Sequence, residues 1–335
     1  MRIVITGGAG FIGSHVCDAL LRAGNQVAIV DNLDDYYAPS MKRANLARIA
    51  EQGKAAYYEL DIRDLQRLKK VFEREKPDVV VHLAARAGVR PSIAYPQAYV
   101  ATNIEGTLNI LEAMRSGKVP KLIFASSSSV YGKRSTVPFR ESDDVSRPIS
   151  PYAATKLAGE QMVYTYCHLY GLQAVCLRFF TVFGPRQRPD LAIRLFYERL
   201  RSGLPIHMFG DGSSGRDYTF ISDIVDGVLA AIDLRVSYEV VNLGSSRPIF
   251  LREMIAEIGK VLRIQPNICE TNSQPGDVAI TYADTGKAEE LLGYRPKVSF
   301  VEGIGLFHAW YQQQSVIEIP ADYPTGRKEE ICALQ

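Results

Sequence analysis

The sequence predicts an α/β protein in which a doubly wound parallel sheet is followed by a smaller α/β region toward the C-terminus. Three observations predict this fold class. Short apolar runs alternate with amphipathic runs through residues 1–178. The apolar runs are continuous, which is typical of strands that are buried on both faces. A glycine-rich turn joins the first apolar run to the first amphipathic run, as in the opening unit of such a sheet.

The glycine-rich turn has the spacing of a dinucleotide-binding (Rossmann) loop. It follows the apolar residues 3–5 and opens an amphipathic run that carries Val16 and Leu20. Three glycines, each three residues from the next, let the chain turn sharply and let a pyrophosphate approach main-chain N–H groups at a helix N-terminus. The alternative is a purely structural glycine turn. The residues of the turn that we assign to the dinucleotide are Gly7, Gly10, Phe11, Ile12 and Gly13.

The second strand, residues 26–30, is followed by Asp31, which indicates the kind of dinucleotide. A carboxylate at this place accepts hydrogen bonds from the ribose hydroxyls of NAD and repels the additional phosphate of NADP. We therefore predict NAD as the cofactor, with Asp31 and the adjacent Asn32 among its ligands. The alternative is an ordinary loop aspartate.

Later strands bring further residues to the carboxyl edge of the sheet, where ligands bind in open parallel sheets. The third strand lies near residues 56–58 and the fourth at residues 79–83. Arg86 and Arg90 follow the fourth strand and either clamp a phosphate or carboxylate or are solvated loop residues. Asn103, on the next predicted helix, either serves the site or lies on a surface or dimer face. The cofactor contacts expected from these strands are Asp61, Ile62, Leu83, Ala84 and Ala85.

Composition excludes several classes of protein. The 335 residues are 47% hydrophobic and carry a formal net charge of +2, a balance that argues against nucleic acid as the main partner. No apolar run is long enough to span a membrane, and the first strand begins at residue 2, so we expect a cytoplasmic protein without a leader peptide. The cysteines are scattered without C-x-x-C spacing, which predicts neither disulfides nor a metal site.

The fifth strand, residues 121–125, runs into four consecutive serines and then Val-Tyr-Gly. Four serines alone are typical of a flexible linker, but after a buried strand they place a row of hydroxyl groups at the carboxyl edge of the sheet. Downstream, Ser150 and Pro151 predict the start of a helix. Tyr152 and Lys156 lie four apart on that helix, so their side chains share one face.

This tyrosine and lysine are suited to proton transfer. A free tyrosine has a pKa near 10, and poising it near 7 takes about three units, or roughly 4 kcal/mol. A lysine cation and the positive nicotinamide ring would together supply that preference. The spacing alone also occurs by chance, but its place after the fifth strand and the hydroxyl cluster favours a catalytic role.

The glycine motif, the serine-rich Val-Tyr-Gly segment and the Tyr152/Lys156 pair together resemble the extended short-chain dehydrogenase/reductase superfamily. The resemblance extends from residue 1 to about residue 314. It implies an NAD-binding domain, a smaller C-terminal domain that binds a nucleotide sugar, and a homodimer formed through the helices of residues 99–116 and 151–170. It also implies that Tyr152 is the catalytic base, that Lys156 is its partner and that Ser127 is the catalytic hydroxyl.

The same resemblance divides the chain into domains. Residues 1–178, rejoined by residues 221–243, would form the NAD-binding domain. Residues 179–220 and 244–314 would bind the nucleotide sugar. No function is assigned to the tail, residues 315–335.

In the second domain, the resemblance implies that Arg216 contacts the diphosphate and that Asp277 lies at the nucleotide end of the substrate. The alternative for Arg216 is a salt bridge to Asp217 or Asp223. The superfamily usually has arginine where this chain has Gln274, so that contact is not carried over.

A tyrosine base beside NAD can take a proton from a sugar hydroxyl while the carbon gives a hydride to the nicotinamide, which leaves a ketone. Dehydratases and decarboxylases of the superfamily carry an acidic pair or a glutamate where this chain has Ser128 and Ser129. Without that acid, we expect the ketone to rotate and to take the hydride back on its other face, which is a 4-epimerisation.

The substrate prediction depends on residues beyond the sixth strand. Many nucleotide-sugar epimerases have asparagine where Thr181 stands, whereas the Phe-Phe-Thr-Val-Phe-Gly-Pro, Arg-Pro-Asp and Ala-Gly-Val-Arg segments resemble UDP-glucuronate 4-epimerases. The hydroxyl groups of Ser127, Ser128, Ser129 and Thr181 form an end of the site that would hold the carboxylate. Arg188 and Arg90 are further substrate candidates. The alternatives are a UDP-glucose/galactose 4-epimerase, a UDP-glucuronate decarboxylase and a non-catalytic NAD-binding module.

Overall fold

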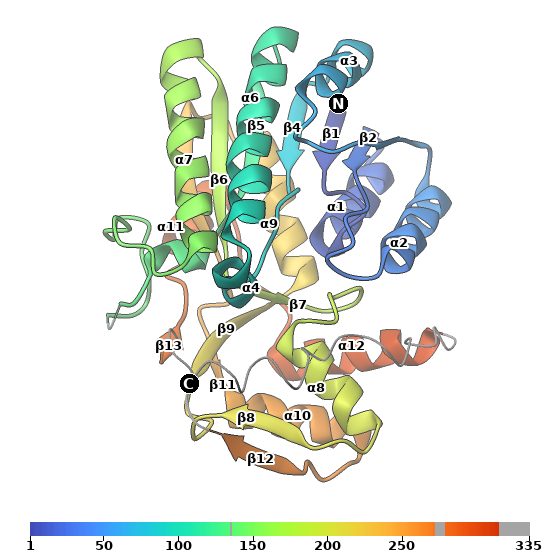
Figure 1. Ribbon diagram of the computed structural model, residues 1–335, viewed down its shortest axis with the longest axis vertical. Coiled ribbons are helices and arrows are strands. Elements are labelled where there is room, and N and C mark those ends of the chain that lie inside the picture. The colour runs from blue at the N-terminus through green and yellow to red at the C-terminus, as the bar shows by residue number, and fades with distance from the viewer. Residues whose placement is uncertain (135, 272–278, 315–335) are drawn as a thin grey trace.

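The computed structural model describes residues 1–134, 136–271 and 279–314 (Figure 1). Within them, the largest feature is a seven-stranded sheet in which all neighbouring strands are parallel. The order is β10-β6-β5-β4-β1-β2-β3, which reverses direction between β1 and β4, the place where ligands bind in doubly wound sheets. The strands are β1 Arg2–Thr6, β2 Gln26–Asp31, β3 Ala55–Glu59, β4 Val79–His82, β5 Lys121–Ser127, β6 Gln173–Phe179 and β10 Tyr238–Leu243.

Helices cover both faces of this sheet because successive strand residues point to opposite sides. On one side, Ile3 and Val81 pack with α1 (Phe11–Arg22) and α9 (Ile221–Asp233). On the other, Val4 and Val80 pack with α3 (Leu65–Glu75), α6 (Gly106–Gly117) and α7 (Pro151–Tyr170). Figure 1 shows α6 and α7 on the near side of the sheet. The continuous apolar pattern of the strands follows from this double burial, and the predicted doubly wound fold is confirmed.

A second group of elements lies beyond the carboxyl ends of the large sheet, in the lower half of Figure 1. Its sheet has the order β11-β9-β13, with β7 also paired to β9, and β8 and β12 form a separate pair. Between these segments the chain returns to the large sheet, where β10 pairs with β6. The strands and helices are β7 Thr181–Phe183, α8 Ala192–Arg201, β8 Ile206–Phe209, β9 Gly215–Phe220, β11 Pro248–Phe250, α10 Leu251–Leu262, β12 Ile268–Thr271, β13 Ile280–Thr281 and α12 Phe300–Gln313. The helix α11 (Gly286–Leu292) lies against β10 and α9 of the large sheet.

The helix that precedes β3 is α2 (Pro39–Gln52), which has a proline in its first turn. The segment from residue 89 to residue 116 differs from the sequence prediction. The predicted single helix 99–116 is three segments: α5 (Pro96–Tyr99), the π-helix η1 (Val100–Glu105) and α6. Apolar spacing cannot distinguish these helix types, because all three place residues three to five apart on one side. A short helix, α4 (Val89–Ala94), also occupies part of the segment expected to be a loop.

Candidate active site

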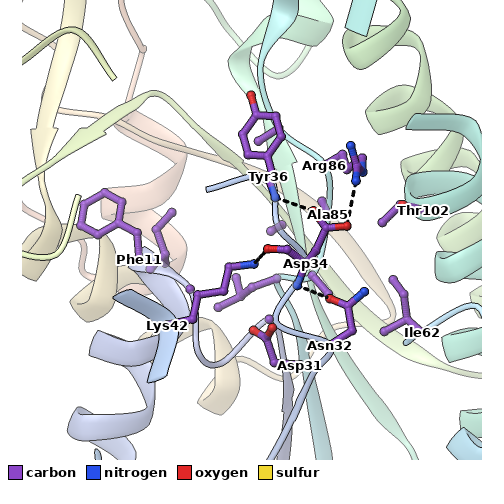
Figure 2. Close-up of a pocket in the computed structure, with 18 of the residues that line it drawn as sticks. Phe11, Asp31, Asn32, Asp34, Tyr36, Lys42, Ile62, Ala85, Arg86 and Thr102 are labelled. Atoms are coloured by element: carbon purple, nitrogen blue, oxygen red, sulfur yellow. Dashed lines mark hydrogen bonds and ion pairs between the residues drawn. The ribbon is translucent and has the colours of Figure 1, made fainter. Parts of the chain in front are cut away.

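A cavity of about 210 Å³ opens at the carboxyl ends of β1, β2, β4 and β5. All of the cofactor residues predicted from the sequence line it, and Figure 2 shows part of this lining. These residues are Gly7, Gly10, Phe11, Ile12, Gly13, Asp31, Asn32, Asp61, Ile62, Leu83, Ala84, Ala85, Tyr152 and Lys156.

The glycine turn is close-packed in the way that a dinucleotide-binding loop requires. Gly7 has a φ of 72°, and a Cβ there would lie 2.7 Å from the backbone nitrogen of Ala84. A Cβ on Gly13 would lie 2.2 Å from the carbonyl oxygen of Gly7, so only glycine lets α1 approach the turn. The Gly10 N–H donates to the same carbonyl over 3.1 Å. This bare backbone at the start of a helix fits the pyrophosphate of NAD.

Asp31 holds the glycine turn as well as lining the cavity. Its carboxylate accepts hydrogen bonds from the backbone N–H groups of Ala9, over 3.1 Å, and Leu33, over 2.9 Å. Burial raises the pKa of Asp31, and the nearby Lys42 ammonium and these hydrogen bonds act in the opposite direction. The carboxylate therefore lies in the second-strand position expected for the ribose ligand, rather than in an unconstrained loop.

The two arginines after β4 have different surroundings. Arg86 lines the cavity and forms an ion pair with Asp34 over 2.8 Å, so it is neither solvated nor directed only at a ligand anion. Arg90 lies outside the lining, with its guanidinium 5.1 Å from the ring centre of Phe209. Asn103 is buried, and its amide exchanges two hydrogen bonds with the Arg86 backbone and donates a third to Thr155. Its role in this structure is to fix the loop after β4.

The helix that carries the tyrosine and lysine begins as predicted. The Ser150 hydroxyl accepts the Ala153 N–H over 3.1 Å and so caps α7. On the next turn the Lys156 ammonium donates to the Ala125 carbonyl over 2.8 Å, which ties α7 to β5. Burial lowers the pKa of Lys156 to about 8, and the Glu160 carboxylate opposes that shift.

Tyr152 lines the same cavity, where burial has the largest effect on its pKa. Burial raises the pKa of Tyr152, while hydrogen bonding with Ser127 and the charge of Arg188 lower it by less. The described hydrogen bond of Lys156 goes to the Ala125 carbonyl, and Lys156 is not among the groups that shift the pKa of Tyr152. Without the dinucleotide, burial dominates the pKa of Tyr152, and the lowering by Lys156 and the nicotinamide ring together stays a prediction.

The serine cluster forms a tight turn at the end of β5. The Ser129 N–H donates to the Ser127 hydroxyl over 3.1 Å, and the Ser127 hydroxyl contacts that of Ser129 over 3.2 Å. Ser128 and Ser129 lie in the short 3₁₀ helix Ser128–Tyr131. The segment is therefore ordered and is not a linker, and it places Ser127 beside Tyr152.

The predicted substrate residues are only partly brought to the cavity. Arg188 lines it and is held by two hydrogen bonds to Asp190, of 3.0 and 2.8 Å. Thr181 begins β7, and Arg216 lies on β9, where it donates to the Gly215 carbonyl over 2.8 Å. Gln274 and Asp277 fall outside the described residues, as does the tail.

The two aspartates weighed as partners of Arg216 serve the loops around them. Asp217 is buried and accepts hydrogen bonds from the backbone N–H groups of Ser245, Ser246 and Ala283. Asp223 accepts from the backbone of residues 297 and 298. Burial raises the pKa of both carboxyls. Both therefore stabilise turns of the second group of elements.

Sequence reasoning missed several residues of the cavity. Tyr36 and Tyr37 follow β2, and the aromatic pair in a polar loop was the available signal. No local pattern indicates the others, because the fold brings them from separate segments. The missed lining residues include Asp34, Tyr36, Tyr37, Lys42, Leu60, Thr102 and Phe179.

Two structural absences concern the described residues. Among residues 1–134, 136–271 and 279–314, no helix is long and apolar enough to cross a bilayer. The same residues contain no group of three or more His, Cys, Asp or Glu side chains placed to hold a metal ion. Cys17, Cys167, Cys176 and Cys269 are free thiols.

A doubly wound sheet with a glycine turn, a carboxylate at the end of β2 and a Tyr/Lys helix defines the chain as a nicotinamide-dinucleotide enzyme of the short-chain dehydrogenase/reductase type. The NAD dependent epimerase/dehydratase family matches residues 3–244, and the chain belongs to this family.

Relatives of known type cover nearly the whole chain. A UDP-glucuronate 4-epimerase of Thermodesulfobacterium geofontis is 42% identical over 311 residues, which cover 92% of this chain and 96% of that protein. The crystal structure of UDP-glucuronic acid 4-epimerase from Bacillus cereus with UDP-glucuronic acid and NAD has a TM-score of 0.88 and 35% identity, and covers 94% of this chain and 100% of the other. A Thermotoga maritima UDP-glucose 4-epimerase with UDP-glucose has a TM-score of 0.86 and 35% identity, and covers 93% and 99%.

Proposed function

We propose that this protein is an NAD-dependent 4-epimerase that interconverts UDP-glucuronate and UDP-galacturonate. The observation that carries the proposal is the placement of Tyr152 and Lys156 in the cavity that the glycine turn and Asp31 also line. Similarity to UDP-glucuronate 4-epimerases over most of the chain supports the same substrate. When bound, NAD supplies a hydride acceptor that becomes a donor in the second half of the reaction.

Tyr152 is the base that takes the proton from the 4-hydroxyl of the sugar. Burial favours the neutral phenol, so the protein alone holds the proton on Tyr152 until a positive charge enters the cavity. Ser127 hydrogen-bonds to the phenol and orients it. Lys156, fixed on the Ala125 carbonyl, supplies a cation beneath the cavity and hydrogen-bond donors to what binds there.

The residues after Ser127 decide the fate of the ketone. Ser128 and Ser129 carry no acid that could donate a proton for elimination, and neither can act as a carboxylate base. The 4-keto sugar therefore rotates and takes the hydride back on its other face. Tyr152 returns its proton to the new alkoxide, so no proton or electron is lost in the cycle.

A uronate substrate adds a hazard, because oxidation at C4 makes a β-keto acid that can lose CO₂. That loss requires the bond to the carboxylate to align with the π system of the ketone. Hydroxyl groups of Ser128, Ser129 and Thr181 would hold the carboxylate in the plane of the ketone and so suppress it. Arg188, at the cavity wall, would close over the sugar.

This part of the proposal can be tested by replacing the hydroxyls. Thr181→Val together with Ser128→Ala and Ser129→Ala should raise the amount of UDP-pentose by-product formed per epimerisation event. Ser213→Ala, which lies on an exposed turn, is a matched control and should not change it. An unchanged by-product ratio in the triple variant would mean that these hydroxyls do not hold the carboxylate.

A UDP-glucose/galactose 4-epimerase is the second candidate, and the Thermotoga maritima structure supports it. Thr181, in the position where many such enzymes have asparagine, favours the uronate. A decarboxylase is disfavoured by Ser129, and a non-catalytic NAD-binding module has no need of the Ser127, Tyr152 and Lys156 set. Turnover of each UDP-sugar, followed separately, distinguishes these candidates.

The proposal includes a cytoplasmic homodimer and two domains. Residues 1–178 and 221–243 would hold NAD, and residues 179–220 and 244–314 the UDP-sugar. The dimer is supported by exposed apolar side chains on the paired α6 and α7 region, where Leu108 is 39% and Tyr164 53% exposed. Such a surface is typical of helices that pack against a second copy.

A further inference from the structure

Three loops that are distant in the sequence meet at the wall of the cavity. They follow β2 (residues 32–37), β4 (residues 84–88) and β7 (residues 184–190). We infer that Asp34, Tyr36, Arg86 and Arg188, called the clasp below, join these loops so as to keep NAD and NADH in the cavity through the reaction cycle. All four residues line the cavity.

The first half of the clasp is the ion pair between Arg86 and Asp34, 2.8 Å long, with about a quarter of each side chain exposed. Figure 2 shows the Arg86 guanidinium directed at the Asp34 carboxylate. The other oxygen of Asp34 accepts the Tyr36 N–H over 2.9 Å. The Arg86 backbone is fixed by Asn103, over 2.8 and 2.9 Å. Both partners are therefore held in place before any ligand binds. The two loops consequently lose little conformational entropy when the ligand binds.

The second half of the clasp is the Tyr36 ring. The Arg188 guanidinium lies 5.4 Å from the ring centre, and Asp190 holds that guanidinium in its orientation. The Tyr36 hydroxyl is hydrogen-bonded to Tyr99, whose own hydroxyl donates to the Ala87 carbonyl over 2.9 Å. The loop after β2 is thus tied to both of the other loops.

The sheet order gives these contacts their significance. β2 and β4 are the two neighbours of β1, and the glycine turn follows β1 directly. A bond between the loops after β2 and β4 therefore bridges the end of the strand that carries the glycine turn. A dinucleotide seated on that turn can leave only when the bridge or the Tyr36 contact opens.

An epimerase needs such retention more than a dehydrogenase does. A dehydrogenase exchanges its cofactor in each turnover, whereas an epimerase must keep the reduced cofactor until the hydride has returned. The inference rests on NAD binding and on the hydride-return mechanism of the proposed function, and it is independent of the sugar. Release of the cofactor can be measured without any sugar, so failure of one proposal is distinguishable from failure of the other.

The test measures how fast NADH leaves the protein. Wild-type protein and variants are loaded with NADH, mixed with a large excess of NAD, and followed by the loss of nicotinamide fluorescence. Arg86→Gln and Asp34→Asn should each speed release about five- to tenfold, as expected for loss of a partly buried charged pair. The double variant should release NADH no faster than either single variant, because both changes remove one interaction.

Two further variants separate the halves of the clasp. Tyr36→Ala should also speed release, and Tyr36→Phe should do so less, because it keeps the ring beneath Arg188. Arg2→Gln removes the exposed ion pair with Asp78 at the opposite end of the sheet and is the matched control. It should release NADH at the wild-type rate.

Three results would overturn the inference. One is an Arg86→Gln rate equal to that of Arg2→Gln. Another is a wild-type rate in Asp34→Asn while Arg86→Gln releases faster, since the arginine would then act on the cofactor alone. The third is a double variant whose acceleration is the product of the single effects. If Arg86→Gln lowers the Tm of the NAD-free protein strongly, the Asp34→Asn and Tyr36→Ala rates decide the question.

Discussion

Replacing Glu160 with glutamine should destabilise the protein by about 3 to 5 kcal/mol, because it leaves the buried Arg178 without a charged partner. The two side chains, 2% and 4% exposed, form two hydrogen bonds of 2.9 and 2.8 Å between α7 and β6. Ser126 donates a third to Glu160, over 2.5 Å. The Arg178 guanidinium also lies 4.9 Å from the Tyr131 ring centre. The glutamine amide keeps one acceptor oxygen but carries no charge to offset the buried guanidinium.

The same change should alter the pH dependence of catalysis. Burial lowers the pKa of Lys156, and the Glu160 carboxylate raises it. The two effects together give Lys156 a pKa of about 8. Without the carboxylate the pKa of Lys156 falls further, so the lysine loses its proton at a lower pH. The alkaline limb of the pH–rate profile should therefore move toward acid.

Thermal unfolding and pH–rate profiles check both effects. A loss of this size lowers Tm by roughly 5 to 15 °C in a protein of this length. Glu289→Gln, which removes the exposed ion pair with Arg295, is the control and should leave Tm unchanged. A Glu160→Gln protein with the Tm of wild type and the same alkaline limb would refute this account of the buried pair.

Three further predictions follow from single features of the structure. Gly13→Ala should abolish NAD binding, because its Cβ would lie 2.2 Å from the Gly7 carbonyl oxygen, and normal NAD content in the purified variant would contradict this. The contribution of His15 and His82 to stability should fall by about 3 kcal/mol from pH 6.5 to pH 5. Burial lowers the pKa of His15 to about 4 and that of His82 to about 3. Between pH 6.5 and pH 5 these histidines therefore bind protons in the unfolded chain and stay neutral in the folded chain. A Tm that does not change over this pH range would contradict the prediction. Leu108→Arg should convert the expected dimer to a monomer in analytical ultracentrifugation, unless the exposed face of α6 is not the interface.

Most of the large sheet could be predicted because its signals are local. The apolar runs ending at residues 30 and 83 are strands that are buried on both faces, and glycine spacing marks the turn that only glycine can make. The helix types around Asn103 could not be predicted, because π-helical and α-helical turns share one apolar spacing. The pairing of β7, β11 and β13 with β9 could not be predicted either, because it depends on contacts between distant segments.

The candidate site was predictable to the extent that its residues follow strands. Asp31, Asp61 and the loop after β4 all reach the cavity by that rule. The Arg86–Asp34 pair was not predictable, since it joins two loops that are 52 residues apart in the sequence. The direction of the Tyr152 pKa shift also required the structure, because burial of the phenol exceeds the effect of nearby charge.

The central claim is that the chain epimerises a UDP-uronate and keeps its cofactor. The most direct measurement incubates the purified protein with UDP-glucuronate and, separately, with UDP-glucose, and follows the sugar protons by NMR and the absorbance at 340 nm. The account predicts conversion of UDP-glucuronate to UDP-galacturonate, without accumulating NADH or CO₂. Turnover of UDP-glucose alone, or net NADH formation, would contradict it.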